Sequence, residues 1–247
     1  MIRIFCISRI NLLSGRTNVY NLTKTCEALN AVPDFFVKLV TTDQDRGTSD
    51  FFKKVGVTRP FDVVTLGVTN TISRWSGRGW YEFLMLIYAN FCLVLFLLKR
   101  RKEFDVVYFR DDSVFFTVLF ARFILRKKIF FEVHSVLERW YRQMRNVISA
   151  RVSHGVIAIS GGLRNFYQKI NNNTLLSLCS AAEDVWFDHK KSKTEFRKEL
   201  EIPNDRFILG YTGVVGLNPN DDYYELDDVI KGLRLLPQKI TCVIVGE

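Results

Sequence analysis

Short apolar runs rich in β-branched and aromatic residues alternate along the chain with longer segments whose apolar positions recur at helical spacing. The short runs predict strands at 2–8, 35–42, 61–66, 105–109, 128–133, 156–160, 174–178, 206–212 and 240–246. The longer segments predict helices at 18–31, 80–98, 113–125, 136–150, from 161 onward, and at 226–236. Strands this apolar are covered on both faces, which is typical of parallel sheets. The alternation therefore predicts a doubly wound, Rossmann-like α/β fold.

A polar stretch at 188–205 interrupts this pattern with several lysines and a proline, a composition typical of a linker. We therefore expect a Rossmann-like domain at 1–188, a linker at 189–205 and an incomplete second Rossmann-like domain at 206–247. The last part holds one β-α-β unit of about 40 residues, which is too small to bury an independent core.

The composition narrows the class of protein. With 48% hydrophobic and 25% charged residues, the chain matches an ordinary globular protein and excludes disorder and a polytopic membrane protein. Its five cysteines include no CxxC pair and its three histidines lie far apart, so neither a disulfide framework nor a metal site is predicted. The first residues lack a signal-peptide pattern. We expect a cytoplasmic protein that uses no metal and no cofactor.

The net charge is +9, and several of the basic residues gather in clusters. The clusters are 99–102 (KRRK), 126–128 (RKK), then Arg139, Arg142 and Arg145, and finally Lys190, Lys191 and Lys193. Such clusters suit phosphate, anionic lipid or nucleic acid, and a solvated surface without a dedicated partner is the plain alternative. A nucleic-acid-binding protein is the least favoured interpretation, because aromatic residues interleave with the basic ones only at 139–142.

The segment 80–98 contains 19 residues of which only Glu82 and Asn90 are polar, and the KRRK cluster follows it. As a helix it would span about 28 Å, close to the thickness of a bilayer core. The strands before and after it are predicted to share one sheet, which disfavours a membrane crossing. Two interpretations stay open: a buried crossover helix, or a helix in the membrane interface with its basic tail on anionic headgroups. We expect peripheral attachment rather than spanning.

Familiar nucleotide-binding signatures are missing from the sequence. The loop after the first strand contains one glycine, Gly15, and therefore no dinucleotide-binding GxGxxG. Gly15 suits either turn geometry or a loop that binds a phosphate. Asp43 and Asp45 form a DxD, for which solvated loop carboxylates are favoured over a divalent-ion site.

Polar residues follow three consecutive predicted strands. Arg110 follows the strand at 105–109, Glu132 and His134 mark the end of the next, and Ser160 precedes a predicted helix after the third. The carboxyl ends of parallel strands meet at one edge of a sheet, where ligands bind. We therefore expect these side chains to line one crevice.

Five segments carry a resemblance to a known family. In order they are DVVYFRD, KIFFEVHS, VSHGVIAISGGLRNFY, CSAAEDVWF and FILGYTGVVG. Their order and spacing resemble the retaining GT-B glycosyltransferases of the group 1 (GT4-like) family, over most of the chain from 105 onward. The resemblance implies transfer of a sugar from a nucleotide-sugar, with no required metal. With the apolar helix and the basic clusters, it suggests a lipid-linked or polysaccharide acceptor in envelope glycan synthesis.

The resemblance also implies roles for individual residues. His134 would contact the transferring sugar, Glu132 would orient His134, and Arg110 would line the same cleft. The positions expected near the donor and its phosphates are Gly15, Arg16, Ser160, Thr212, Gly213 and Gly216.

The chain departs from the family pattern in its last third. Residues 180–183 read SAAE where the family has NGVD, and 214–227 contain acidic residues but no lysine or arginine. The family's acidic E-x7-E element has no counterpart in 206–247. We therefore expect a glycosyltransferase truncated within its donor lobe that does not catalyse alone. The alternative is a non-catalytic saccharide-binding or partner subunit, with the donor lobe completed by another chain.

Overall fold

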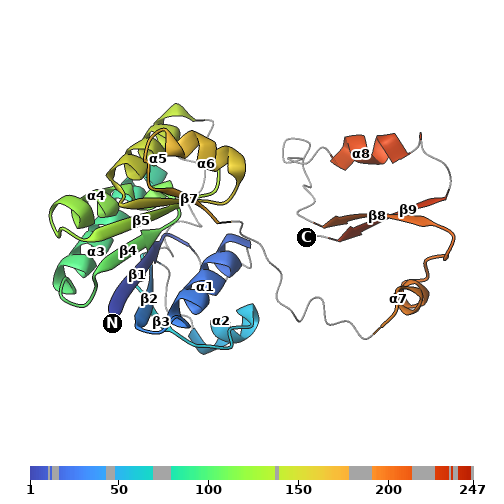
Figure 1. Ribbon diagram of the computed structural model, residues 1–247, viewed down its shortest axis with the longest axis horizontal. Coiled ribbons are helices and arrows are strands. Elements are labelled where there is room, and N and C mark those ends of the chain that lie inside the picture. Colours follow the sequence, from blue (N-terminus) through green and yellow to red (C-terminus); the bar gives the residue numbers. More distant parts are fainter. Residues whose placement is uncertain are drawn as a thin grey trace. The chain divides into compact units, whose positions relative to one another are not determined.

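The computed structural model describes residues 1–10, 12, 17–42, 48–68, 79–136, 139–177, 191–212, 226–233, 235 and 239–245. The chain forms two compact units, Met1–Ala181 and Ala182–Glu247 (Figure 1). The strands of the first unit are β1 (Ile2–Ser8), β2 (Phe35–Thr41), β3 (Asp62–Thr65), β4 (Val106–Phe109), β5 (Lys128–Val133), β6 (Gly155–Ala158) and β7 (Thr174–Leu176). Its helices are α1 (Thr17–Asn30), α2 (Thr48–Val55), α3 (Gly79–Lys99), the 3-10 turn η2 (Asp112–Val114), α4 (Phe115–Phe123), α5 (Trp140–Val152) and α6 (Gly161–Gln168). The second unit contains α7 (Lys193–Glu199), β8 (Phe207–Thr212), α8 (Leu226–Leu233) and β9 (Ile240–Val245).

The first unit is built on a seven-stranded sheet in the order β3-β2-β1-β4-β5-β6-β7. All neighbouring strands in it are parallel. The strand order reverses between β1 and β4, so the connections after these two strands leave in opposite directions and open a crevice at the carboxyl edge. The predicted doubly wound, Rossmann-like sheet is confirmed.

Alternate residues of each strand feed two hydrophobic clusters, one on each face of the sheet. One cluster joins Cys6 and Leu39 to Leu22 of α1 and Phe51 of α2. The other joins strand residues to the helices α3 to α6 through Leu93, Val118, Ala150 and Leu163. The helices α1 and α2 thus cover β1 to β3 on one face, and the four later helices cover the opposite face.

Helix α3 packs against the sheet through one side only. Met85, Ala89, Leu93 and Leu97 recur every four residues and are buried. Asn90, with 3% of its surface exposed, stands beside this stripe. In the part of the chain that the structure describes, no helix is both long and apolar enough to cross a membrane.

The side chain of Asn90 holds the segment that follows β4 against α3. Its Nδ2 donates to the carbonyl oxygens of Leu86 and Ser113, both at 2.8 Å. Its Oδ1 accepts from the backbone N–H of Thr117 at 3.1 Å and from Thr117 Oγ1 at 2.9 Å. Every polar group of the buried amide is therefore used, and η2 and the start of α4 are held against α3.

The second unit contains a parallel two-stranded sheet, β8 beside β9, with α8 between them in the chain. The stretch that we expected as a linker differs from that expectation because it contains helix α7. A capping box begins the helix: Ser192 Oγ accepts from the backbone N–H of Glu195, and Glu195 Oε2 accepts from that of Ser192. Helix α2, which the sequence pattern did not predict, is the other additional element.

A buried carboxylate joins α1 to the segment that leads into β3. Glu27 Oε1 accepts from the backbone N–H groups of Thr58, at 2.6 Å, and Arg59, at 2.8 Å. Lys24 Nζ donates to the other oxygen at 3.0 Å. Burial opposes ionisation of Glu27, but hydrogen bonds from Arg59, Lys24 and Thr58 outweigh it and lower its pKa from 4.5 to about 2.

Replacing Glu27 with alanine is expected to lower the free energy of unfolding by about 2 kcal/mol, because two backbone donors lose their acceptor. The folded-state pKa lies below 4.5, so the carboxylate stabilises the fold above about pH 4.5 and this contribution is lost as the pH falls toward 2. Urea denaturation at several pH values measures both effects. The control is Glu103→Ala, which removes an exposed pair with Arg100. Equal stability losses for the two variants would contradict the assignment.

Candidate functional site

The carboxyl edge of the first unit's sheet brings together three of the predicted site residues. Strands β4 and β5 pair in parallel with Phe109 opposite Phe131, so Arg110 leaves β4 where Glu132 stands in β5. Residues two apart along a strand share a face. Arg110, Glu132 and His134 therefore follow the alternation of Tyr108 and Phe130, on the face that α1 covers.

The three side chains are in direct contact. Arg110 Nε lies 3.1 Å from Glu132 Oε1 and 3.0 Å from His134 Nε2. The same Nε2 lies 2.5 Å from Glu132 Oε1 and 2.6 Å from Arg110 Nη2. The Arg110 and Glu132 side chains are each 8% exposed, whereas that of His134 is 30% exposed. The buried ion pair thus forms the base of the site, and the imidazole is the part that solvent reaches.

This geometry defines what each group can do. His134 Nε2 faces both an acceptor and a donor, so it donates to Glu132 when it carries the proton and accepts from Arg110 when it does not. Arg110 also reaches the carbonyl oxygen of Asn18 at the start of α1, at 3.4 Å. Its guanidinium is therefore directed at protein groups and positions the other two side chains. The imidazole is the group suited to hydrogen-bond a bound hydroxyl.

A hydrogen-bonded aspartate ties the neighbouring strand ends together. Ser8 Oγ, at the end of β1, donates to Asp111 Oδ2 at 2.8 Å. Asp111 also accepts from the backbone N–H of Ser113 and so caps η2. The ends of β1 and β4 are therefore held together next to Arg110.

Other predicted site residues stand apart from this contact. Ser160 follows β6 at the same edge, and its hydroxyl caps α6 by accepting from the backbone N–H of Leu163. Thr212 ends β8 in the second unit. The predicted residues that lie outside the described part of the chain are Gly15, Arg16, Gly213 and Gly216, and the DxD residues Asp43 and Asp45.

A cavity of about 720 Å³ opens at the same edge and was not predicted as a site. Its charged lining comprises Arg9, Asp112, Arg139, Arg142 and Arg145. Asp112 is buried and bonds Arg142 Nη2 at 2.9 Å and Arg145 Nη2 at 2.6 Å. The hydrogen bond to Asp112 raises the pKa of Arg142 further above its ordinary value. The three-residue spacing of Arg142 and Arg145 was the sequence signal available for this cluster. Nothing in the sequence identified Asp112 of η2 as their partner.

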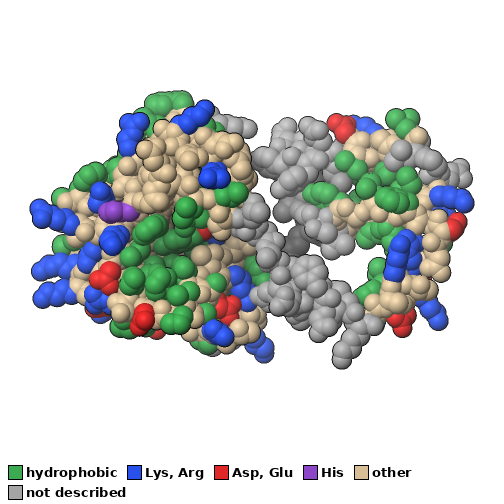
Figure 2. All heavy atoms as spheres, in the orientation of Figure 1, with side chains coloured by type: hydrophobic (Ala, Val, Ile, Leu, Met, Phe, Trp, Pro, Cys, Tyr) green, Lys and Arg blue, Asp and Glu red, His purple; other side chains and the backbone are tan. Residues whose placement is uncertain are grey.

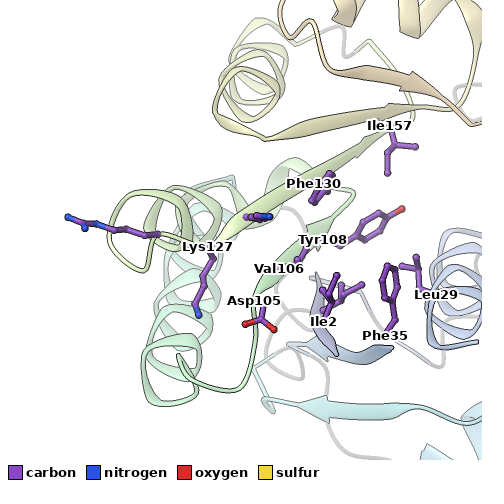
Figure 3. Close-up of a pocket in the computed structure, with 12 residues that line it drawn as sticks. Ile2, Leu29, Phe35, Asp105, Val106, Tyr108, Lys127, Phe130 and Ile157 are labelled. Carbon is purple, nitrogen blue, oxygen red and sulfur yellow. The ribbon is translucent and has the colours of Figure 1, made fainter. Parts of the chain in front are cut away.

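A second cavity, of about 610 Å³, lies at the opposite edge, near the amino ends of β1, β4 and β5 (Figure 3). Apolar side chains such as Ile4, Tyr108 and Phe130 line most of it. Figure 2 shows hydrophobic side chains gathered in the middle of the visible face of the first unit. Neither Glu132 nor His134 contributes to this cavity, which is separate from the candidate site.

No family model and no curated protein sequence matches the chain. Solved structures do match it. HepE from Anabaena, in complex with UDP and glucose, is 15% identical with a TM-score of 0.64, over 100% of this chain and 61% of HepE. Sucrose-phosphate synthase from Thermosynechococcus elongatus is 15% identical with a TM-score of 0.63, over 100% of this chain and 71% of the synthase.

UDP-GlcNAc 2-epimerase from Neisseria meningitidis, bound to UDP-GlcNAc, is 11% identical with a TM-score of 0.60, over 100% of this chain and 66% of the epimerase. The first unit has the fold of a Rossmann-like GT-B lobe. At sequence identities of 11–15%, the similarity to these structures shows a shared fold and nothing further. The chain spans about 61% of the length of HepE.

Removing Arg110 is expected to leave the buried Glu132 carboxylate without its cation. We expect Arg110→Met to lower the free energy of unfolding by about 3 kcal/mol, and Arg110→Met combined with Glu132→Gln to recover part of that loss. Urea denaturation measures each value. The control Arg100→Met, which removes the exposed partner of Glu103, should change stability by about 0.5 kcal/mol or less. No recovery in the double variant would show that the pair is not coupled.

Proposed function

We propose that this chain forms the acceptor-side lobe and the start of the donor lobe of a retaining, GT4-like glycosyltransferase. Its donor is a nucleotide-sugar, and its acceptor is a lipid-linked glycan or polysaccharide of envelope glycan synthesis. One observation carries the proposal: Arg110, Glu132 and His134 meet at the carboxyl edge of a GT-B-type sheet. Ligands of open parallel sheets bind at that edge. HepE and the epimerase of the same fold were solved with UDP and glucose or with UDP-GlcNAc.

In this proposal the three residues have different tasks. His134 is the catalytic residue because its exposed imidazole contacts the sugar that is transferred. Glu132 and Arg110 are positioning residues, since they are buried and act through the imidazole. Their contacts hold the ring in one place, and that reduces the reorganisation needed when the sugar binds.

The departing nucleotide diphosphate needs positive charge or backbone N–H groups near it. In the first unit we assign this task to Gly15 and Arg16, which follow β1 in the sequence, and to the start of α6 at Ser160. For the second unit by itself, we propose that Thr212 at the end of β8, with Gly213 and Gly216 after it in the chain, binds the donor. The proposal assigns no metal to this step.

The alternative is a saccharide-binding or partner subunit that another chain completes. The segment 214–227 supports it, because acidic residues and no lysine or arginine follow β8. Acidic side chains repel a diphosphate. Saccharide binding without nucleotide-sugar binding would favour this alternative.

We also propose that the protein acts at the cytoplasmic face of a membrane, to which it binds peripherally. The exposed apolar side of α3 and the basic clusters support it. An acceptor carried on a lipid would then be available where the protein is held.

The test uses the enzyme with its donor lobe completed, and it measures release of the nucleotide diphosphate from a panel of UDP- and GDP-sugars in the presence of extracted lipid-linked acceptors. We expect His134→Ala to lower turnover by about 100-fold or more, because a positioned imidazole contributes at least that much. The matched control His189→Ala should leave turnover within about twofold of the parent. Equal effects of the two substitutions would overturn the assignment of His134. Absence of nucleotide-sugar binding to the chain would overturn the proposed donor.

A further inference from the structure

The outer side of α3 is apolar although it faces solvent. Seven large side chains on it are between 39% and 56% exposed: Phe83, Leu84, Ile87, Tyr88, Phe91, Leu95 and Leu98. Each of them lies three or four residues from another member of the set, and together they form a stripe opposite the side that packs on the sheet. The stripe is about 23 Å long at the rise of an α-helix. Contiguous apolar surface of this kind marks a site where a protein or a membrane binds.

The neighbouring helices extend this surface. Helix α4 packs beside α3 and exposes Phe116 and Phe123, and the exposed Ile124 follows directly after it. Helix α5 exposes Met144, which lines the 720 Å³ cavity together with Phe83 of α3 and Phe116 of α4. The cavity therefore opens where the apolar sides of three helices meet. We call the exposed apolar residues of α3 and α4 the α3–α4 face.

Positive charge lies at both ends of the α3–α4 face. At the end of α3, residues 99–102 form the exposed KRRK cluster. At the other end, Arg9, Arg139, Arg142 and Arg145 line the cavity. Asp112 is the acidic residue among those that line it, and it holds Arg142 and Arg145 together. Two guanidiniums share one carboxylate, so the cluster keeps an excess of positive charge in a fixed arrangement that suits a phosphate.

We propose that the α3–α4 face docks on an anionic phospholipid membrane and that the arginine-lined cavity takes a lipid phosphate. The charge pattern selects this occupant, because a bilayer offers an apolar layer beneath a negatively charged surface. A second copy of the chain fits poorly, since a twofold contact through this face would bring basic clusters together. The inference deepens the proposed membrane attachment and rests on it, but it does not require glycosyl transfer.

The position of the cavity gives the docking a consequence. Arg9 follows β1 and Asp112 follows β4, so the cavity lies at the same sheet edge as Arg110 and His134. The cavity opens among α3, α4 and α5, on the face of the sheet opposite to the one that carries Arg110 and His134. A lipid phosphate held in the cavity would therefore share the sheet edge of the candidate site without contacting its residues.

The test is flotation of the 247-residue chain with phosphatidylcholine vesicles that contain or lack phosphatidylglycerol. We expect binding to the anionic vesicles only, and weaker binding at high salt because salt screens the attraction. The triple variant Ile87→Ser, Phe91→Ser, Leu95→Ser should lower the partition coefficient by roughly tenfold or more. Its control, Leu175→Ser with Leu200→Ser, removes exposed leucines from other elements and should leave binding unchanged. Circular dichroism confirms that each variant is folded.

A second pair of variants tests the cavity. Arg139→Gln with Arg142→Gln should lower binding to anionic vesicles by about fivefold for each arginine, while Arg145 still neutralises Asp112. The control is Arg151→Gln with Arg164→Gln, two exposed arginines that do not line the cavity. Equal losses in the two double variants would show that only net charge matters and would overturn the assignment of the cavity.

Three further outcomes would overturn the docking surface: no binding to any vesicle, equal binding to neutral vesicles, or binding that the serine variants do not change. Dimerisation in the ultracentrifuge that the serine variants abolish would assign the face to a second copy. A separate titration with UDP-sugars distinguishes this inference from the proposed reaction. Vesicle binding without donor binding would support the proposed docking surface and contradict the proposed glycosyl transfer.

Discussion

The seven strands of the first unit run parallel, and this constraint determines where everything else lies. Each strand delivers its carboxyl end to one edge, so residues far apart in the chain meet there. The connection between successive strands has to return along the sheet, which requires a helix or a long crossover. The longest of these connections contains α3, which starts near the carboxyl edge and ends near the amino edge. The candidate site and the apolar outer side of α3 are both consequences of the same arrangement.

Burial of Glu132 gives the candidate site its rigidity. A buried carboxylate needs a cation and hydrogen bonds, and Arg110 supplies both from the adjacent strand. Because both groups are nearly inaccessible, neither is placed to bind a ligand directly, and His134 is held by them at the surface. The Asn90 amide contributes in the same way at the next connection, since it fixes η2, from which Asp112 organises two arginines. Buried polar contacts thus determine the position of the exposed functional groups.

Much of the fold followed from the sequence, and the reasons are local. Short runs such as 128–133 are rich in apolar β-branched and aromatic residues. This composition and their short length indicate strands without any knowledge of tertiary contacts. The ends of the predicted strands placed Arg110, Glu132 and His134 along one edge of the sheet, whereas their direct contact came from the structure. Helix α2 was not predicted because it is only eight residues long and its apolar residues are limited to Phe51, Phe52 and Val55. Helix α7 was not predicted because its capping box lies within a lysine-rich stretch. The pairing of Asp112 with Arg142 spans 30 residues and depends on tertiary packing that no local pattern contains.

We propose that the His134 imidazole lies where the sugar of the donor binds. Side-chain NMR of the histidine rings during a titration with UDP-glucose tests this placement. The His134 ring signals should shift and saturate, while those of His154 stay fixed, because His154 accepts from the backbone N–H of Ile129 and faces Arg122. Saturable binding that leaves the His134 ring signals unchanged would show that His134 lies outside the donor site.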